Sequence, residues 1–355
     1  MQHQHGGDVE GYLRRFGREP LDFSANISPL GLPEGVRRAA AEALGRADEY
    51  PDPQCRRLRE AIAGKTGLRP EWLVCGCGAA DLIYRLALAR RPARALVTAP
   101  GFFEYEAALG TVGCETAFFE LRAQENFELT GRFLQAITPG LGLVFLCQPN
   151  NPTGRAIPRP LLLEILEACR AAGAVLVLDE CFVPFLDDPA AGSLQDRLEA
   201  YPNLVLLRAF TKLYAMPGLR LGYAATADAA LARDLLAAGQ PWAVSGPAQA
   251  AGIAALREDD YVKKARALVR AERAFLLEGL RAAGAAELGG EANYLFFRSP
   301  DPALCEKLLP RGILLRDCAN YRGLGPGYCR AAVRTHPENV RLLAAVQEIL
   351  GNREI

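Results

Sequence analysis

Lys212 is the residue of this 355-residue chain whose type and position best suggest covalent chemistry, and Arg220 follows it by eight positions in a Gly-Leu-Arg-Leu-Gly segment. Lys212 follows an apolar run, residues 204–207, which predicts a short buried strand. A partly desolvated lysine has a lowered pKa, and its neutral amine can form a Schiff base with an aldehyde. A lone lysine in a loop is more commonly a surface residue, so the rest of the chain must supply the partners that such an imine needs.

Apolar runs separated by helical patterns predict the element that positions this lysine. The predicted strands are residues 73–75, 95–99, 143–147, 174–178 and 204–207, with helices that include residues 79–89 and 159–172. This alternation predicts an α/β fold with a parallel sheet covered on both faces. Polar residues follow several strands directly, and open α/β sheets bind ligands beyond the carboxyl ends of their strands.

The small residues after the first of these strands indicate an anion site. Gly78 and Ala79 lie between strand 73–75 and the helix that follows, where free backbone N–H groups point out of the helix start. A tight turn between a strand and a helix would have the same composition. Asp179 closes the most apolar strand, where it could pair with a cation or cap a helix.

After residue 260 the pattern changes to a smaller α+β unit. A long helix over residues 263–280 is followed by strands at 292–298, 313–316 and 328–333 and by helices at 302–309 and 338–350. We expect residues 1–45 to form an N-terminal arm and part of the small domain. Residues 46–260 would form the large domain, and residues 261–355 the linking helix and the C-terminal small domain.

Composition limits the partners. Lys+Arg and Asp+Glu are both 41, so the net charge is zero, which argues against nucleic acid or an anionic membrane surface as a partner. No run of 18 apolar residues is present, and the N-terminus has no apolar core, so we expect a cytoplasmic protein. The ten cysteines lie mostly singly and are expected to be reduced core residues. No metal site is expected, although Cys75 and Cys77 form a C-x-C and His3 and His5 lie close together.

The Lys212 segment resembles that of fold-type I pyridoxal 5'-phosphate (PLP) enzymes of the aminotransferase-like group. An Asn-Pro-Thr-Gly segment begins at Asn151, Asp179 follows 28 residues later, and Lys212 follows 33 residues after that. The resemblance implies a large domain with a mainly parallel, seven-stranded-type sheet, a small α+β C-terminal domain, and PLP as cofactor. Lys212 would form the Schiff base, and Asp179 would pair with the pyridine nitrogen.

The same resemblance implies the other cofactor contacts. Asn151 would bind the phenolic oxygen and Phe102 would stack on the ring, while the phosphate would be held by Gly78, Ala79, Thr211 and Arg220. Tyr50 would reach the cofactor phosphate of a neighbouring subunit, which implies a homodimer. Two positions depart from the family pattern: Ala209 lacks a hydroxyl that usually binds phosphate, and Phe182 replaces a common tyrosine.

Two branches of the group compete, and the chain resembles threonine-phosphate decarboxylases of cobalamin biosynthesis more than histidinol-phosphate aminotransferases. The His-Gly-Gly segment at His5 and the Arg-Asp-Cys segment at Arg316 carry this resemblance. It implies decarboxylation of L-threonine O-3-phosphate to (R)-1-aminopropan-2-ol O-phosphate for the cobalamin nucleotide loop. The alternatives are a histidinol-phosphate aminotransferase and another phospho-amino-acid decarboxylase, such as one for phosphoserine. The implied substrate contacts are His5, Gly6, Asn26, Asn151, Arg316 and Arg330.

Charge supports an anionic substrate. A phosphorylated amino acid carries about three negative charges, and arginine binds both carboxylate and phosphate bidentately. Four arginines lie within one short region and are expected to gather around such a substrate: Arg316, Arg322, Arg330 and Arg334. A solvated basic face would show the same pattern. The choice between decarboxylation and amino transfer rests on the resemblance alone.

Overall fold

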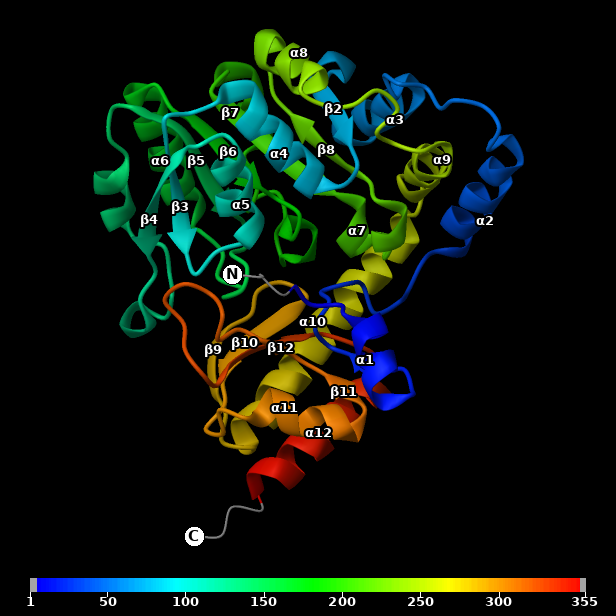
Figure 1. Cartoon of the computed structure of the whole chain (residues 1–355), viewed down its shortest axis with the longest axis vertical. Helices are drawn as coiled ribbons and strands as arrows, with labels where there is room; N and C mark the ends of the chain where they lie inside the picture. The colour runs from blue at the N-terminus through cyan, green and yellow to red at the C-terminus, as the bar shows by residue number, and fades with distance from the viewer. Residues whose placement is uncertain (1–4, 352–355) are drawn as a thin grey trace.

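The computed structural model describes residues 5–351 and shows a large upper unit and a smaller lower unit (Figure 1). Residues 1–4 and 352–355, which include His3 and the ends of the first and last predicted domains, lie outside the described residues. Within the described part, no helix combines the length and the hydrophobicity needed to cross a membrane.

The large unit is built on a seven-stranded sheet in which every strand except β8 points the same way. This confirms the predicted parallel sheet. The strands, in their order across the sheet, are β2 (Leu73–Gly76), β8 (Gly222–Ala225), β7 (Leu204–Ala209), β6 (Val175–Asp179), β5 (Leu141–Cys147), β3 (Arg94–Ala99) and β4 (Glu115–Glu120). The sequence patterns did not predict β8 or β4, because β8 is four small or aromatic residues and β4 is a partly exposed edge strand.

Helices cover both faces of this sheet, as expected from the alternating pattern. Alternate residues of β5 enter two separate apolar clusters, one on each face. One face packs against α4 (Ala79–Arg90), α5 (Phe103–Thr111) and α8 (Ala229–Ala237). The other face packs against α3 (Arg56–Thr66), α6 (Arg159–Ala172) and α9 (Gly246–Ala255). The bounds of α6 are those predicted, because Pro158 precedes it and Gly173 ends it in the left-handed region.

The small unit follows α10 (Asp259–Ala282), which runs from the large unit downward in Figure 1. Its antiparallel sheet has the order β12-β13-β10-β9. The strands are β9 (Ala286–Gly289), β10 (Tyr294–Arg298), β12 (Arg316–Asp317) and β13 (Tyr328–Ala332), and the helices are α11 (Leu304–Leu308) and α12 (His336–Gly351). The strand predicted at 313–316 is divided into β11 (Ile313–Leu314) and β12.

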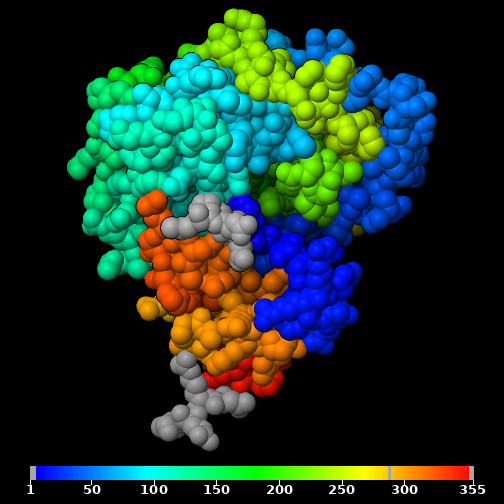
Figure 2. Space-filling view, in the orientation of Figure 1, coloured from blue at the N-terminus to red at the C-terminus, as the bar shows by residue number. Residues whose placement is uncertain are grey.

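The N-terminal segment belongs to both units. After α1 (Val9–Phe16), β1 (Leu21–Asp22) pairs in parallel with β11 of the small unit. The chain then crosses to α2 (Glu34–Ala43), which packs against α9 of the large unit. The blue N-terminal residues consequently lie along the seam between the two units (Figure 2).

Candidate active site

A cavity of about 250 Å³ lies beyond the carboxyl ends of the sheet strands, where the small unit and the N-terminal segment meet the large unit. Eleven of the fourteen residues predicted from the sequence line it: His5, Gly6, Asn26, Ala79, Phe102, Asn151, Asp179, Thr211, Lys212, Arg220 and Arg330. Gly78, Arg316 and Tyr50 do not. The structure thus brings together residues from opposite ends of the chain, and their chemical roles remain predictions.

Lys212 lies on α7 (Phe210–Leu213), a single turn that follows β7. Its Nζ is 5.8 Å from the centre of the Phe182 ring. Burial, followed by the positive charges of Arg330 and Arg220, lowers the pKa of this lysine to about 8. The amine is therefore half neutral near pH 8, which is the form that attacks a carbonyl group.

Asp179 ends β6, with only 5% of its surface exposed. Its Oδ1 accepts a hydrogen bond of 3.0 Å from the Cys181 backbone N–H, and its Oδ2 accepts one of 2.8 Å from the Tyr105 hydroxyl. Two donors hold the carboxylate in one orientation at the cavity wall. Each oxygen keeps a further lone pair for a cationic group in the cavity.

An anion cradle lies at the N-terminus of α4. Gly78 caps this helix at φ 85°, a conformation that favours glycine, and provides no side-chain acceptor for the first N–H groups. A Cβ at Gly78 would lie 2.8 Å from Nη2 of Arg220, and one at Gly222 would lie 2.7 Å from the Ala79 nitrogen. The two glycines therefore allow the Arg220 guanidinium to approach the N-terminus of α4. The guanidinium and the helix N-terminus together favour the binding of a phosphate.

Arg330 and Asn26 form the opposite wall. Arg330 is 6% exposed; it donates to Oδ1 of Asn151 and, over 2.8 Å, to the carbonyl oxygen of Ser24. Its Nε has no hydrogen-bond partner among the described residues, nor has either amide atom of Asn26, which is 2% exposed. Buried polar atoms without partners are costly, so this wall is suited to a polar ligand.

The N-terminal arm closes one side of the cavity. Nε2 of His5 is 2.7 Å from a carboxylate oxygen of Glu104, and the imidazole lies 6.0 Å from the Phe102 ring. Gly6 passes so close to Ser24 that a Cβ there would lie 2.2 Å from the Ser24 carbonyl oxygen. Only glycine fits at this crossing, whereas Gly7 has a φ of 89°, a conformation that favours glycine.

The prediction of one four-arginine cluster is wrong. Arg330 lines the cavity, and Arg316, its register partner on β12, lines an adjoining hollow of about 590 Å³. Arg334 pairs with Glu338 at the start of α12, and Arg322 pairs with Glu106 on the surface of α5. Nearby glutamates therefore neutralise two of the four arginines away from the cavity.

Tyr50 also lies away from the cavity. Its side chain is 80% exposed and stacks on Trp242, with 4.5 Å between ring centres. The structure of one chain gives this tyrosine no role in that chain's own cavity. Its role in a neighbouring subunit stays a prediction.

Sequence reasoning missed several groups at this site. The Ser24 contact is made by a backbone carbonyl, which no residue type reveals. Tyr105 was not predicted as a site residue, although it follows Phe102 by three positions at the start of a helix, a spacing that brings side chains together. Tyr321 and Cys147 also line the cavity.

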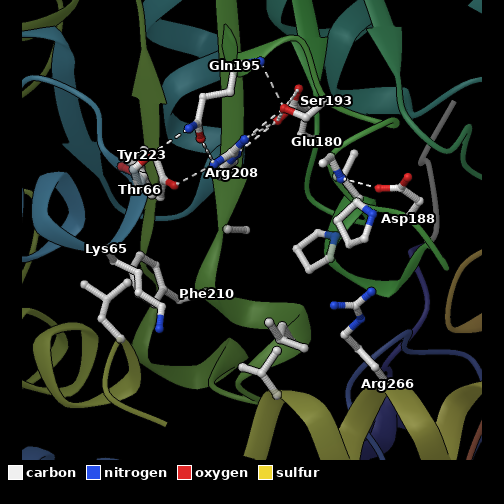
Figure 3. A pocket seen from close by; sticks show the side chains of 18 of the residues that line it. Lys65, Thr66, Glu180, Asp188, Ser193, Gln195, Arg208, Phe210, Tyr223 and Arg266 are labelled. Carbon is white, nitrogen blue, oxygen red and sulfur yellow. Dashed lines mark hydrogen bonds and ion pairs between the residues drawn. The ribbon is translucent and has the colours of Figure 1, made fainter. Parts of the chain in front are cut away.

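A larger cavity of about 830 Å³ lies on the other side of α7 (Figure 3). Here Glu180, which is fully buried, accepts hydrogen bonds from the Ser193 hydroxyl at 2.8 Å and from Arg208 at 2.7 Å. Arg208 also donates to Gln195 over 2.8 Å. The charged groups are satisfied by each other, so this network stabilises the fold around α7.

The sheet, the lysine after β7 and the anion cradle all lie within the part of the chain that matches one protein family. The family described as aminotransferase class I and II matches residues 18–346, and the chain belongs to this family. It is 38% identical to the threonine-phosphate decarboxylase of Salmonella typhimurium over 98% of this chain and 96% of the relative.

Two further relatives come from the aminotransferase branch. The chain is 34% identical to the histidinol-phosphate aminotransferase of Symbiobacterium thermophilum, over 98% of this chain and 95% of the relative. The crystal structure of the histidinol-phosphate aminotransferase from Clostridium acetobutylicum superimposes with a TM-score of 0.87 at 27% identity, covering 93% of this chain and 99% of that one.

Proposed function

We propose that this protein is a PLP-dependent decarboxylase of L-threonine O-3-phosphate. The observation that carries the proposal is the 38% identity to a threonine-phosphate decarboxylase over 98% of the chain. The cavity supports it with a lysine of lowered pKa, an anion cradle and a second wall that contains a buried arginine. The product would be (R)-1-aminopropan-2-ol O-phosphate, for the cobalamin nucleotide loop.

The residues present fit PLP. Gly78, Ala79, Thr211 and Arg220 would hold its phosphate, Asp179 its ring nitrogen, Asn151 its phenolic oxygen and Phe102 one ring face. When bound, the cofactor supplies an aldehyde and an electron-withdrawing ring.

The chain's own groups would do the rest of the work. Arg330 would bind an anionic group of the substrate, and Asn26 would hydrogen-bond it with amide atoms that have no partner among residues 5–351. Lys212 would deliver a proton from Nζ to the substrate Cα after carbon dioxide leaves, because a pKa of about 8 lets it both hold and release a proton near neutrality. His5 and Gly6 would exclude water from the cavity.

The remaining predictions join this proposal. A homodimer is supported by the exposed Tyr50–Trp242 stack, which a neighbouring subunit could cover. The division at residue 260 is supported by α10, which leads out of the large unit. The division at residue 45 is not, because α2, which precedes it, packs against α9 of the large unit. A cytoplasmic location stays a prediction from the sequence.

One experiment tests the substrate and the reaction together. Purified protein with PLP is incubated with phosphothreonine, phosphoserine or histidinol phosphate, with and without a keto acid. We expect carbon dioxide release from phosphothreonine, independent of the keto acid. Amino transfer from histidinol phosphate without carbon dioxide release would instead support the second candidate, a histidinol-phosphate aminotransferase, which the 34% identical relative favours.

A further inference from the structure

Tyr105 forms a hydrogen bond with Asp179 but has no role in the proposed chemistry. It lies on α5, is 1% exposed, and its hydroxyl is 2.8 Å from Oδ2 of Asp179. An ionised carboxylate only accepts hydrogen bonds, so the phenol is the donor. Burial, followed by the negative charge of Asp179, raises the pKa of Tyr105 well above its ordinary value, which keeps the phenol protonated.

The Tyr105 ring is fixed by its neighbours. It stacks on Phe145 with 5.0 Å between ring centres and an interplanar angle of 15°, and it meets Phe102 edge-on at 5.6 Å and 83°. These contacts leave the ring little room to rotate, so its hydroxyl stays at one place. The same residue therefore contacts the Asp179 carboxylate and the aromatic wall formed by Phe102.

We propose that Tyr105 is a positioning residue that holds the Asp179 carboxylate in one orientation toward a ring N–H in the cavity. The proposal rests on the proposed function, because the N–H belongs to the cofactor. A carboxylate that is already oriented loses less conformational freedom when it accepts a hydrogen bond from a ring N–H, so the bond contributes more to binding. The Cys181 N–H holds the second oxygen, so both Asp179 oxygens are oriented.

The test measures cofactor binding by the apo-protein. The dissociation constants of PLP and of its 1-deaza analogue, which has carbon in place of the ring nitrogen, are compared for wild type and Tyr105→Phe. The Phe variant keeps the stacked ring and loses only the hydroxyl. We expect PLP to bind about tenfold to a hundredfold more weakly, as for loss of a hydrogen bond to a charged group, and the analogue to bind unchanged.

A matched control is Tyr12→Phe, which removes another buried tyrosine hydroxyl, one that donates to the Leu309 carbonyl away from the cavity. It should change neither dissociation constant. Tyr105→Met, with a flexible apolar side chain, provides a second hydroxyl-free variant if the Phe variant folds poorly. In an Asp179→Asn background, Tyr105→Phe should have no further effect on PLP binding.

Equal weakening of PLP and the analogue would overturn the proposal, because a residue that only supports the cavity wall would affect both. Unchanged binding of both would overturn it as well. Failure of wild type to bind PLP would overturn the proposed function along with this inference, so the two failures are distinguishable.

Discussion

Adjacent residues line the two cavities on either side of α7, and the polar groups of the two cavities differ in how fully they are paired. Asp179 faces the smaller cavity, whereas Glu180 faces the larger one and is paired with Arg208 and Ser193. In the smaller cavity both amide atoms of Asn26 and the Arg330 Nε have no partner among the described residues. The larger cavity therefore contains a finished polar network, and the smaller one contains polar groups that a ligand could satisfy. Between these two cavities, unsatisfied buried polar atoms mark the predicted site, whereas the larger volume does not.

The largest expected effect separates two lysines. Lys212→Ala should abolish the borohydride-reducible bond to PLP and lower turnover by at least about a thousandfold, because the covalent anchor and the proton carrier are lost together. Lys65→Ala is the matched control in the larger cavity, where Lys65 pairs with Asp259. Both variants are compared with wild type by their absorbance after borohydride treatment and by their turnover. A reducible bond that persists without Lys212 would contradict the assignment.

The next effect appears in stability. Arg208→Ala leaves the fully buried Glu180 without its cation and should lower the free energy of unfolding by about 3–5 kcal/mol. Denaturant titration measures the loss. The protein that remains folded should keep its kcat/KM within about threefold, because the side-chain hydrogen bonds of Arg208 in the described part of the chain go to Glu180, Gln195, Ser193 and Tyr223, none of which is a predicted site residue. A large loss of activity at unchanged stability would give the larger cavity a functional role.

Asn26 should show the opposite behaviour. Asn26→Leu replaces an unpaired buried amide with an apolar side chain of similar size and should stabilise the apo-protein by about 1–3 kcal/mol. The KM for phosphothreonine should rise, since the substrate loses a hydrogen-bonding partner. Thermal melting and steady-state kinetics measure the two effects. A less stable apo-protein would mean that the amide already has a partner.

The smallest effect concerns pH. Because the pKa of Lys212 is lowered to about 8, its neutral fraction rises from about one tenth at pH 7 to about one half at pH 8. Above pH 9 almost all of the amine is neutral, so the fraction changes little. The rate of PLP attachment to apo-protein, measured by absorbance, should follow this curve. Arg330→Ala removes a nearby positive charge, so the pKa of Lys212 should rise and the curve should move to higher pH. An unmoved curve would show that Arg330 does not lower the pKa of Lys212.

The sequence predicted the buried parallel strands well, because strands covered on both faces are continuous apolar runs such as β6. It missed β4, whose edge position leaves residues exposed, and β8, whose four small or aromatic residues form no pattern. The residues after the strands were predicted because their position follows from the direction of the strands. The ion pairs of the arginines were not predicted. Arg334 lies close to Arg330 in sequence, but Arg334 pairs with Glu338, four residues later.

The pairing of β1 with β11 also has a consequence for how the protein is made. Leu21 and Ile313 are 292 positions apart in the chain, and Arg330 donates to the carbonyl of Ser24 across a similar separation. Contacts between such distant residues form late, after the large loop between them has closed. During synthesis the sheet, Lys212 and Asp179 can assemble first, while the Arg330 wall and the arm wait for the last tenth of the chain. A newly made protein would thus assemble the residues proposed to bind the cofactor before those proposed to bind the substrate.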